Sequence, residues 1–296
     1  MEQYYEQYLR GQNGERKFYI DTVGRISEII SNTDSVAGDD LYLSIDADLQ
    51  KATYIALERE IAGIVYSNIK AGNIPIIDVY KALIGNRVID ISHFTEDDAS
   101  ATEKGLYSSF KNTHKNVQKN IKKELTTSPK ALDQMSDETL DEFTHIISML
   151  KDNGILLTSE IDTNDETYQK WKNQKISPKE YLNYCISQQW IDISQLSVDE
   201  KYADSSEVYD ALCNYILDHL KDDKDFDTII YEYMIARGDI SPRKLCIILF
   251  EQGVLDYDDA TVNKLKNGTL APYDFIMDKI NRVEITPAQL ALEPCT

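Results

Sequence analysis

The sequence predicts a mainly α-helical protein with a short β-containing segment at its start. Strand-like runs are confined to roughly the first 45 of the 296 residues, and the following 220 or so carry few strand signals. That long remainder contains helix caps and apolar residues spaced three and four apart, as in Leu140, Phe143, Ile146, Ile147 and Leu150. At 42% hydrophobic residues, the chain is long enough to bury a sizeable core in one or two domains.

Charge and cysteine content narrow the classes of function. A formal net charge of −20 repels a phosphate backbone, so nucleic acid is excluded as an expected partner and an anionic membrane surface is disfavoured. The four cysteines form no C-x-x-C pair, which argues against a zinc knuckle or a redox pair. Of Cys185, Cys213, Cys246 and Cys295, we expect Cys185 and Cys246 to be core residues. No apolar run is long enough to span a membrane, and no signal sequence opens the chain.

The first 45 residues are predicted to contain strands and turns. Lys17–Ile20 and Arg25–Ile30 are strand candidates on either side of a turn at Thr22–Gly24. Leu41–Ile45 alternates apolar and polar residues and predicts a third short strand. Asp46 then has the position of a helix N-cap, and the apolar spacing from Leu49 onward predicts a helix.

The middle of the chain is predicted to be helical throughout. Its helices are expected from Pro75 to Ala82, from Ala99 to Leu125, from Ser136 to Gly154, and onward from Pro178, Ser205, Asp225, Pro242, Asp258 and Ala271. Two of these starts and a third at Pro287 share a signature, namely Ile176-Ser177-Pro178, Ile240-Ser241-Pro242 and Ile285-Thr286-Pro287. Reuse of one helix–turn unit would explain the signature, but recurrence of a common cap explains it better because the spacings are unequal.

Three ordered motifs near the N-terminus resemble one known family. They are Tyr8-Leu9-Arg10-Gly11-Gln12-Asn13-Gly14, then Phe18-Tyr19-Ile20-Asp21-Thr22-Val23-Gly24-Arg25, then the run from Gly38 to Lys51, GDDLYLSIDADLQK. In this order they resemble the non-catalytic pedestal, or dimerisation, domain of class B penicillin-binding proteins and the linker that leads into the transpeptidase domain. Three ordered matches are far more specific than one short motif.

The resemblance implies a domain plan. We expect the end of a pedestal domain at 1–45, a linker helix at 46–69, an all-α insertion domain at 70–284, and at 285–296 a lead-in to a transpeptidase domain. Ala62–Tyr66 resembles the start of the first strand of that domain, but the usual continuation is missing. The last segment resembles penicillin-binding proteins of some anaerobic Firmicutes. The native chain is expected to extend upstream to a membrane anchor and downstream into the catalytic domain.

The function that follows is a non-catalytic scaffold within an enzyme that cross-links peptidoglycan on the outer face of the cytoplasmic membrane. Its expected partners are the transpeptidase domain of the same chain and proteins of cell division or elongation, with the membrane reached only through the upstream anchor. No cofactor or metal is expected. Two alternatives stay open: a stand-alone helical adaptor of the cell envelope, and an unrelated helical enzyme.

No catalytic residue is predicted. A penicillin-binding transpeptidase needs Ser-x-x-Lys with two further motifs, and the sequence offers only Ser108-Ser109-Phe110-Lys111 and Ser241-Pro242-Arg243-Lys244. Lys266-Asn267-Gly268 lacks the hydroxyl residue of the third motif. Both serines are therefore expected to be ordinary helix residues.

Other candidate residues also have structural interpretations that are favoured over functional ones. The histidines form no helical metal-binding pair and are expected to be structural, namely His93, His114, His145 and His219. Asp256-x-Asp258-Asp259 resembles the start of a calcium loop but lacks its glycine and glutamate. A solvated face explains the lysine stripe better than contact with anionic polymer (Lys111, Lys115, Lys119, Lys122, Lys123). Core packing explains Tyr181, Tyr184 and Trp190 better than a glycan platform does.

Overall fold

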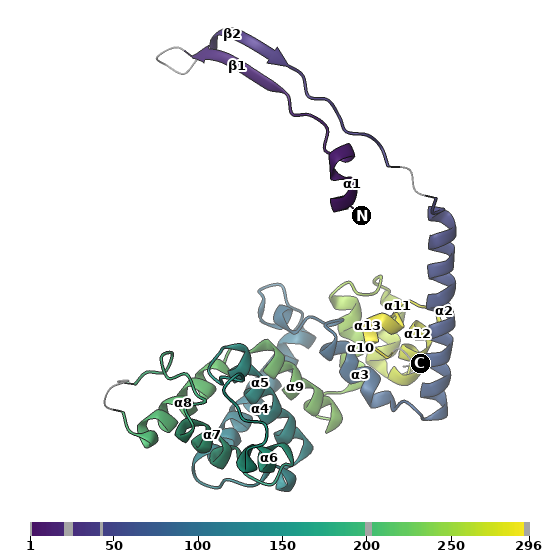
Figure 1. The fold of residues 1–296 in the computed structure, drawn as a ribbon. Coiled ribbons are helices and arrows are strands. Elements are labelled where there is room, and N and C mark those ends of the chain that lie inside the picture. The colour runs from purple at the N-terminus through teal and green to yellow at the C-terminus, as the bar shows by residue number, and fades with distance from the viewer. Residues whose placement is uncertain (1, 21–25, 42–43, 199–202, 293–296) are drawn as a thin grey trace. The chain divides into compact units, whose positions relative to one another are not determined.

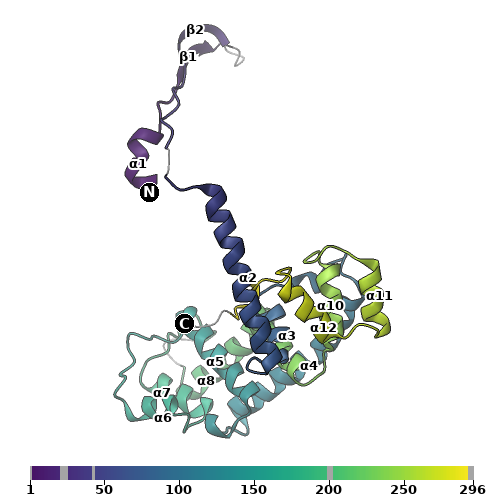
Figure 2. The same ribbon diagram turned by 90° about the vertical axis from the view of Figure 1, so that its right-hand side faces the viewer.

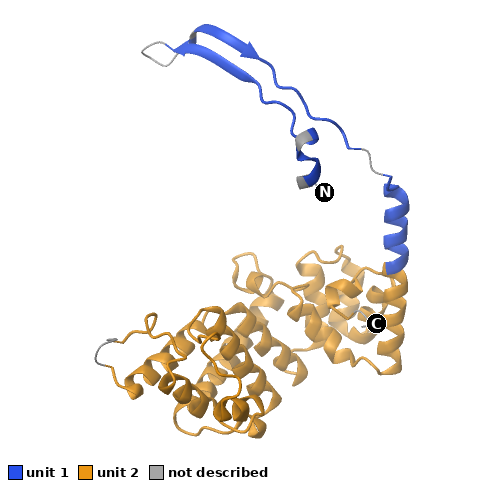
Figure 3. Cartoon of the chain, in the orientation of Figure 1, with its two compact units in different colours: residues 1–57 blue, residues 58–296 orange. Residues whose placement is uncertain are grey.

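The computed structural model describes residues 2–20, 26–41, 44–198 and 203–292. Among these residues it has thirteen α-helices, two short 3₁₀ helices and one two-stranded antiparallel sheet, which confirms the mainly α fold class. The chain divides into two compact units, residues 1–57 and residues 58–296 (Figure 3). The division falls inside a helix, and the four-part domain plan remains a prediction.

Unit 1 is built on a β-hairpin. Helix α1 (Glu2–Leu9) is followed by strands β1 (Glu15–Ile20) and β2 (Ile26–Thr33), which pair antiparallel from Glu15 opposite Thr33 to Ile20 opposite Ile26 (Figure 1). Both strands of the predicted hairpin are thereby confirmed, while its Thr22–Gly24 turn lies outside the described residues. Helix α1 was not predicted. The strand predicted at 41–45 is absent from its described residues Leu41, Ser44 and Ile45.

Helix α2 (Ala47–Ala71) occupies the place of the predicted linker helix. Asp46 caps it as predicted, because its carboxylate accepts hydrogen bonds from the backbone N–H groups of Asp48 and Leu49, both at 3.0 Å. Ala62–Tyr66, which resemble the start of a strand in the family, are helical here, within the range 46–69 given for the linker helix. Ala62, Val65 and Ile69 are buried at helical spacing, so packing of this face explains why the helix continues.

The described elements of unit 2 are all helices, and one continuous hydrophobic core runs from Val65 to Leu290. Its elements after α2 are α3 (Ile76–Gly85), η1 (Ile91–Thr95), α4 (Ala101–Thr126), η2 (Leu132–Gln134), α5 (Asp137–Asp152), α6 (Glu166–Lys172), α7 (Pro178–Ser187), α8 (Ser205–His219), α9 (Lys224–Ala236), α10 (Pro242–Glu251), α11 (Asp259–Asn267), α12 (Pro272–Asn281) and α13 (Pro287–Leu290). Every helix predicted in the middle of the chain is present, and α6 is an addition.

The helices of unit 2 gather into two groups joined by α9. Helices α4 to α8 lie together at one end, and α3 with α10 to α13 lie at the other (Figures 1 and 2). Helix α9 packs against α3 on one side and against α4 and α5 on the other. Helix α9 is therefore the main connection between the two groups, and a smaller direct contact joins α4 to α10.

One helix-ending turn recurs through unit 2. In the described part of unit 2, nine helices end within two positions of a positive-φ residue that is followed two positions later by an Ile or Leu; α13 ends before Ala291, also at positive φ, without that Ile or Leu. The positive-φ residues are Gly72, Arg87, Gly154, Gln174, Gln189, Gly238, Gly253, Gly268 and Val283. A left-handed residue lets the chain reverse while its N–H groups satisfy the last helical carbonyls. This helix-ending turn therefore recurs at more helices than the Ile-Ser-Pro signature of helix starts does.

The helix starts follow the predicted caps with one exception. Ser177 and Thr286 form complete capping boxes with Glu180 and Gln289. Ser241 occupies the same position before α10, but its side chain makes no capping hydrogen bond.

Candidate functional site

The most conspicuous surface feature is the exposed apolar side chains of unit 1. No described residue of unit 1 is buried, and the buried core of the chain begins only at Ala62. Large apolar residues at least 41% exposed occur throughout this unit, as follows: Tyr4, Tyr8, Phe18, Tyr19, Ile20, Ile26, Ile29, Ile30, Val36, Leu41, Ile45, Leu49, Tyr54, Ile55 and Leu57. We call these residues the exposed apolar set. Such a density of exposed apolar side chains is typical of a surface that contacts other protein.

The glycines of the N-terminal motifs hold the two segments that flank the hairpin close together. Gln12 and Val36 exchange two backbone hydrogen bonds of 2.8 and 2.9 Å, and the N–H of Asp39 donates to the carbonyl of Tyr8. A Cβ atom on Gly38 would lie 2.0 Å from the carbonyl oxygen of Leu9, and one on Gly11 would lie 2.3 Å from that of Val36. Only glycine fits where two backbones approach so closely, which explains why the motifs have glycine at these two positions.

Neither Ser-x-x-Lys serine has a base beside it among the described contacts. The Ser108 hydroxyl donates to the carbonyl of Lys104, and the Lys111 ammonium lies 5.1 Å from the centre of the Tyr107 ring. Ser241 stands at the N-cap of α10, where the N–H of Lys244 donates to its carbonyl. A serine nucleophile needs a base within hydrogen-bonding reach of its hydroxyl. That neither serine is catalytic remains a prediction.

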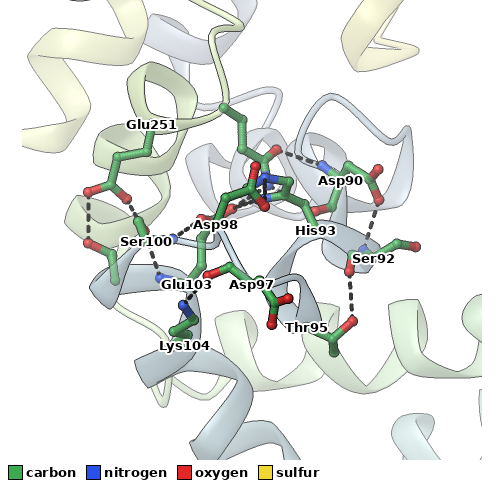
Figure 4. A network of polar contacts seen from close by, with 12 residues as sticks. Asp90, Ser92, His93, Thr95, Asp97, Asp98, Ser100, Glu103, Lys104 and Glu251 are labelled. Carbon is green, nitrogen blue, oxygen red and sulfur yellow. Dashed lines mark hydrogen bonds and ion pairs between the residues drawn. The ribbon is translucent and has the colours of Figure 1, made fainter.

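A buried carboxylate, Glu103, organises a polar network where η1, α4 and α10 meet (Figure 4). It accepts hydrogen bonds from the Ser100 N–H and the Gln252 side-chain amide, both at 2.7 Å, and its Oε1 lies 2.8 Å from Nδ1 of His93. Burial raises the pKa of Glu103, but the hydrogen bonds from Ser100, Gln252 and His93 outweigh it, so the pKa lies below its usual value. The hydrogen bond between His93 and Glu103 also raises the pKa of His93.

The network extends to Glu251 at the end of α10. The hydroxyls of Ser100 and Thr102 donate to its two carboxylate oxygens at 2.7 and 3.0 Å. The Gln252 side chain also donates to the Asp90 carbonyl and accepts from the Asp90 N–H, each at 2.9 Å. Every carboxylate here has partners, so the network is best described as a polar joint that fixes the start of α4 against α10.

Three side chains beside this network come close enough together to be considered for a metal ion. Ligand atoms of His93, Glu96 and Asp98 lie within 4.8 Å of one another. The Nε2 atom of His93 is 3.6 Å from Asp98, and its Nδ1 already contacts Glu103. The hydrogen bond with Glu103 raises the pKa of His93, and protonation of the ring competes with metal binding. The contacts of His93 with Asp98 and Glu103 are those of an ion-pair arrangement. The sequence did not reveal it, because Glu103 lies ten residues after His93.

The remaining histidines have structural contacts with backbone carbonyls, carboxylates and aromatic rings. His114 Nε2 lies 3.1 Å from the Leu220 carbonyl oxygen, His145 Nε2 lies 2.7 Å from Asp223, and His219 contacts the Tyr215 carbonyl. Asp258 caps α11 by accepting a hydrogen bond from the Ala260 N–H, as the helix-start interpretation predicts.

The basic and aromatic stripes have the expected structural settings. All five lysines of the α4 stripe are exposed, and none forms an ion pair within the described parts of the chain. Tyr181 and Trp190 are buried. Tyr181 stacks on Trp171 at 4.4 Å between ring centres, and Tyr184 donates to Asp165. These contacts confirm the core interpretation of the aromatic residues. Cys185 and Cys246 are buried free thiols, as predicted, whereas Cys295 lies outside the described residues.

A polar cavity of about 340 Å³ lies between α4, α5 and the end of α9. One of its lining residues, Glu142, is only 2% exposed and has no hydrogen bond or ion pair among the contacts of the described residues. Burial, with a smaller contribution from Glu138, raises the pKa of Glu142 to about 8. Sequence reasoning missed this residue, although its position four before Ile146 placed it on the apolar face of α5.

A larger cavity of about 740 Å³ lies along α8. The acidic residues on its wall, including Glu207 and Asp210, are exposed. None of its described lining residues is a buried charged group like Glu142, so it offers less chemistry despite its size.

Comparisons with known proteins bear on the N-terminal region. Residues 1–43 match the family model of the penicillin-binding protein dimerisation domain. The chain is 38% identical over 79 residues to the peptidoglycan D,D-transpeptidase FtsI of Escherichia coli K12, and equally to that of Escherichia coli O157:H7. Each match covers 27% of this chain and only 13% of the relative. No solved structure matches the chain. The resemblance of the N-terminal region to penicillin-binding proteins is thereby confirmed.

Proposed function

We propose that this chain is a non-catalytic part of a penicillin-binding protein, a D,D-transpeptidase that cross-links peptidoglycan. In this proposal unit 1 is the end of the pedestal domain and α2 is the linker helix. Unit 2 is an insertion between that linker and the catalytic domain. The parent enzyme would act on the outer face of the cytoplasmic membrane, and no helix among the described residues is long and apolar enough to cross one.

The observation that supports this role best is the exposed apolar set. A two-stranded hairpin is marginally stable by itself in water, and unit 1 offers no described buried residue to stabilise it. Each apolar side chain covered by a partner would contribute roughly 1.5–3 kcal/mol. Unit 1 therefore needs further protein against it, and the family match makes the remainder of a penicillin-binding protein the natural candidate.

The insertion is proposed to dock a protein of the division or elongation machinery. Its own hydrophobic core is continuous, so it has the means to stay folded while it offers its surface to a partner. The net charge of −20 for the whole chain favours a partner surface that carries positive charge.

Covalent labelling by penicillin tests the non-catalytic assignment. The purified chain is incubated with benzylpenicillin beside an active penicillin-binding protein, and both are weighed by intact-protein mass spectrometry. The control is expected to gain the mass of one acyl group, and this chain is expected to gain none. An acyl adduct mapped to Ser108 or Ser241 would overturn the assignment.

A further inference from the structure

The cavity beside Glu142 has an uncharged wall from α4, and its lining also includes Glu142 and the ion-paired Glu138 and Arg237. Helix α4 contributes Thr113, Asn116 and Asn120, whose side chains are polar but carry no charge, together with the apolar side chain of Val117. Helix α5 contributes Glu142, which is 2% exposed. A cavity of about 340 Å³ falls within the range of small-ligand sites.

Glu142 differs from Glu103, the other buried glutamate among the described residues. Glu103 accepts hydrogen bonds from a backbone N–H and a side-chain amide, whereas Glu142 accepts none among the contacts of the described residues. An unpartnered carboxyl in the interior costs free energy that a leucine would avoid. A group held at such a cost beside a cavity is a candidate binding group.

The charges around Glu142 leave its carboxyl without a cation. Arg237, at the end of α9, is already paired with Glu138 and with Asp239. Asp141, next to Glu142 in α5, accepts the Tyr233 hydroxyl proton at 2.6 Å. The charged groups that act on Glu142 are thus Glu138, Asp141 and Arg237, with a negative sum, while the wall from α4 is neutral. These charges would attract a bound cation, and the Glu142 carboxyl would be available to pair with it.

We propose that this cavity binds a primary ammonium group carried on a short aliphatic chain, with Glu142 as its counter-ion. The ammonium has three donors, which suit the carboxylate of Glu142 and the side-chain oxygens of Asn116 and Asn120. Val117 offers apolar surface to the aliphatic part. When the ammonium enters, the neutral Glu142 carboxyl releases its proton to solvent and pairs as the carboxylate, so charge and protons balance.

Calorimetry with a defined probe tests the proposal on the whole chain. The probe is Nα-acetyl-L-lysine methylamide, titrated between about pH 6 and pH 8 in two buffers of different ionisation enthalpy. Because the pKa of free Glu142 is about 8, affinity is expected to rise about fiftyfold over this range. Nearly one proton should be released per ligand at the lower pH and about half a proton at the higher.

Two controls make the result specific to Glu142. Glu142→Gln keeps the size of the side chain and removes its charge, so it is expected to abolish both binding and proton release. Glu166→Gln removes an exposed carboxylate on α6 and is expected to change neither. The Nε-acetylated probe, which carries no charge, is expected not to bind. The proposal is overturned if no heat of binding is seen at any pH, or if Glu142→Gln or the neutral probe binds equally well. The wild-type pH series and the neutral probe decide the matter even if the variant does not fold.

Discussion

Glu103 and Glu142 are both buried glutamates of unit 2, and their surroundings act on them in opposite directions. Three hydrogen-bonding partners hold the pKa of Glu103 below its usual value, whereas burial without partners raises that of Glu142. The first carboxylate is part of a satisfied joint, and the second is available for a ligand. At the scale of residues, both acids are buried, and the presence or absence of hydrogen-bond partners distinguishes a structural carboxylate from a candidate binding carboxylate.

Replacing Glu103 with glutamine should lower the pKa of His93 towards its ordinary value of 6.5, because the neighbouring carboxylate no longer stabilises the imidazolium. The change should be visible in an NMR titration of the His93 ring protons. Glu96→Gln, which removes a more distant charge, should shift the pKa of His93 much less. An unchanged His93 pKa in the Glu103 variant would contradict the network.

The same variant should lose stability most between about pH 4.5 and pH 6.5. The raised pKa of His93 stabilises the fold fully below its unfolded value of 6.5, and this contribution is lost as pH rises through the folded pKa. The lowered pKa of Glu103 stabilises the fold above its unfolded value of 4.5, and this contribution is lost as pH falls through the folded pKa. We expect a loss of about 1–3 kcal/mol in urea denaturation within that window. A larger loss at high pH would contradict a stabilising ion pair between His93 and Glu103.

At the scale of elements, the left-handed turn that ends most helices of unit 2 is filled sometimes by glycine and sometimes by a larger residue. Gly238 has φ +81° and open space where a Cβ would be, whereas Gln189 has φ +60° and is exposed. Only the glycine adopts this conformation without steric cost. Positions that carry a side chain therefore store avoidable strain.

Two substitutions at these turns should change stability in opposite directions. Gly238→Ala should destabilise the protein by about 1 kcal/mol, because alanine is disfavoured at positive φ. Gln189→Gly should stabilise it by up to about 1 kcal/mol, because it removes that penalty at an exposed site. Urea denaturation measures both. Equal stability of Gly238→Ala and the wild type would contradict the explanation of the turn.

Local patterns were sufficient to predict most elements but not the contacts between them. The stripe from Leu140 to Leu150 predicted α5 because helix periodicity is a property of a few neighbouring residues. The strand at 41–45 failed because an alternating pattern needs a partner strand, and none pairs with its described residues. The environment of Glu142 was beyond sequence reasoning, because α4 and the end of α9 build the cavity around it.

At the scale of the whole molecule, the chain joins a unit without a described core to a unit with a continuous one. Unit 2 carries the buried residues from Ala62 to Leu290, and unit 1 carries the exposed apolar set. Such a difference predicts that the two units resist unfolding unequally, since apolar burial is the main stabilising contribution.

Limited proteolysis should reveal this difference. A non-specific protease at low concentration should cut first between the hairpin and α2, within residues 34–46, and leave a long-lived fragment that contains unit 2. Mass spectrometry of the fragments over time gives the order of cleavage. Survival of unit 1 after unit 2 has been degraded would contradict the prediction.

Photo-crosslinking from α2 tests the scaffold role most directly. Benzoylphenylalanine replaces Tyr54, which is 62% exposed, and the chain is co-expressed with the separately encoded catalytic domain of the proposed enzyme. Lys172 on α6, also exposed, is the control position. After irradiation, the scaffold role predicts that position 54 gives a cross-linked adduct that fluorescent penicillin labels. Position 172 is expected to give no such adduct. No penicillin-labelled adduct from position 54, or equal labelling from both positions, would contradict it.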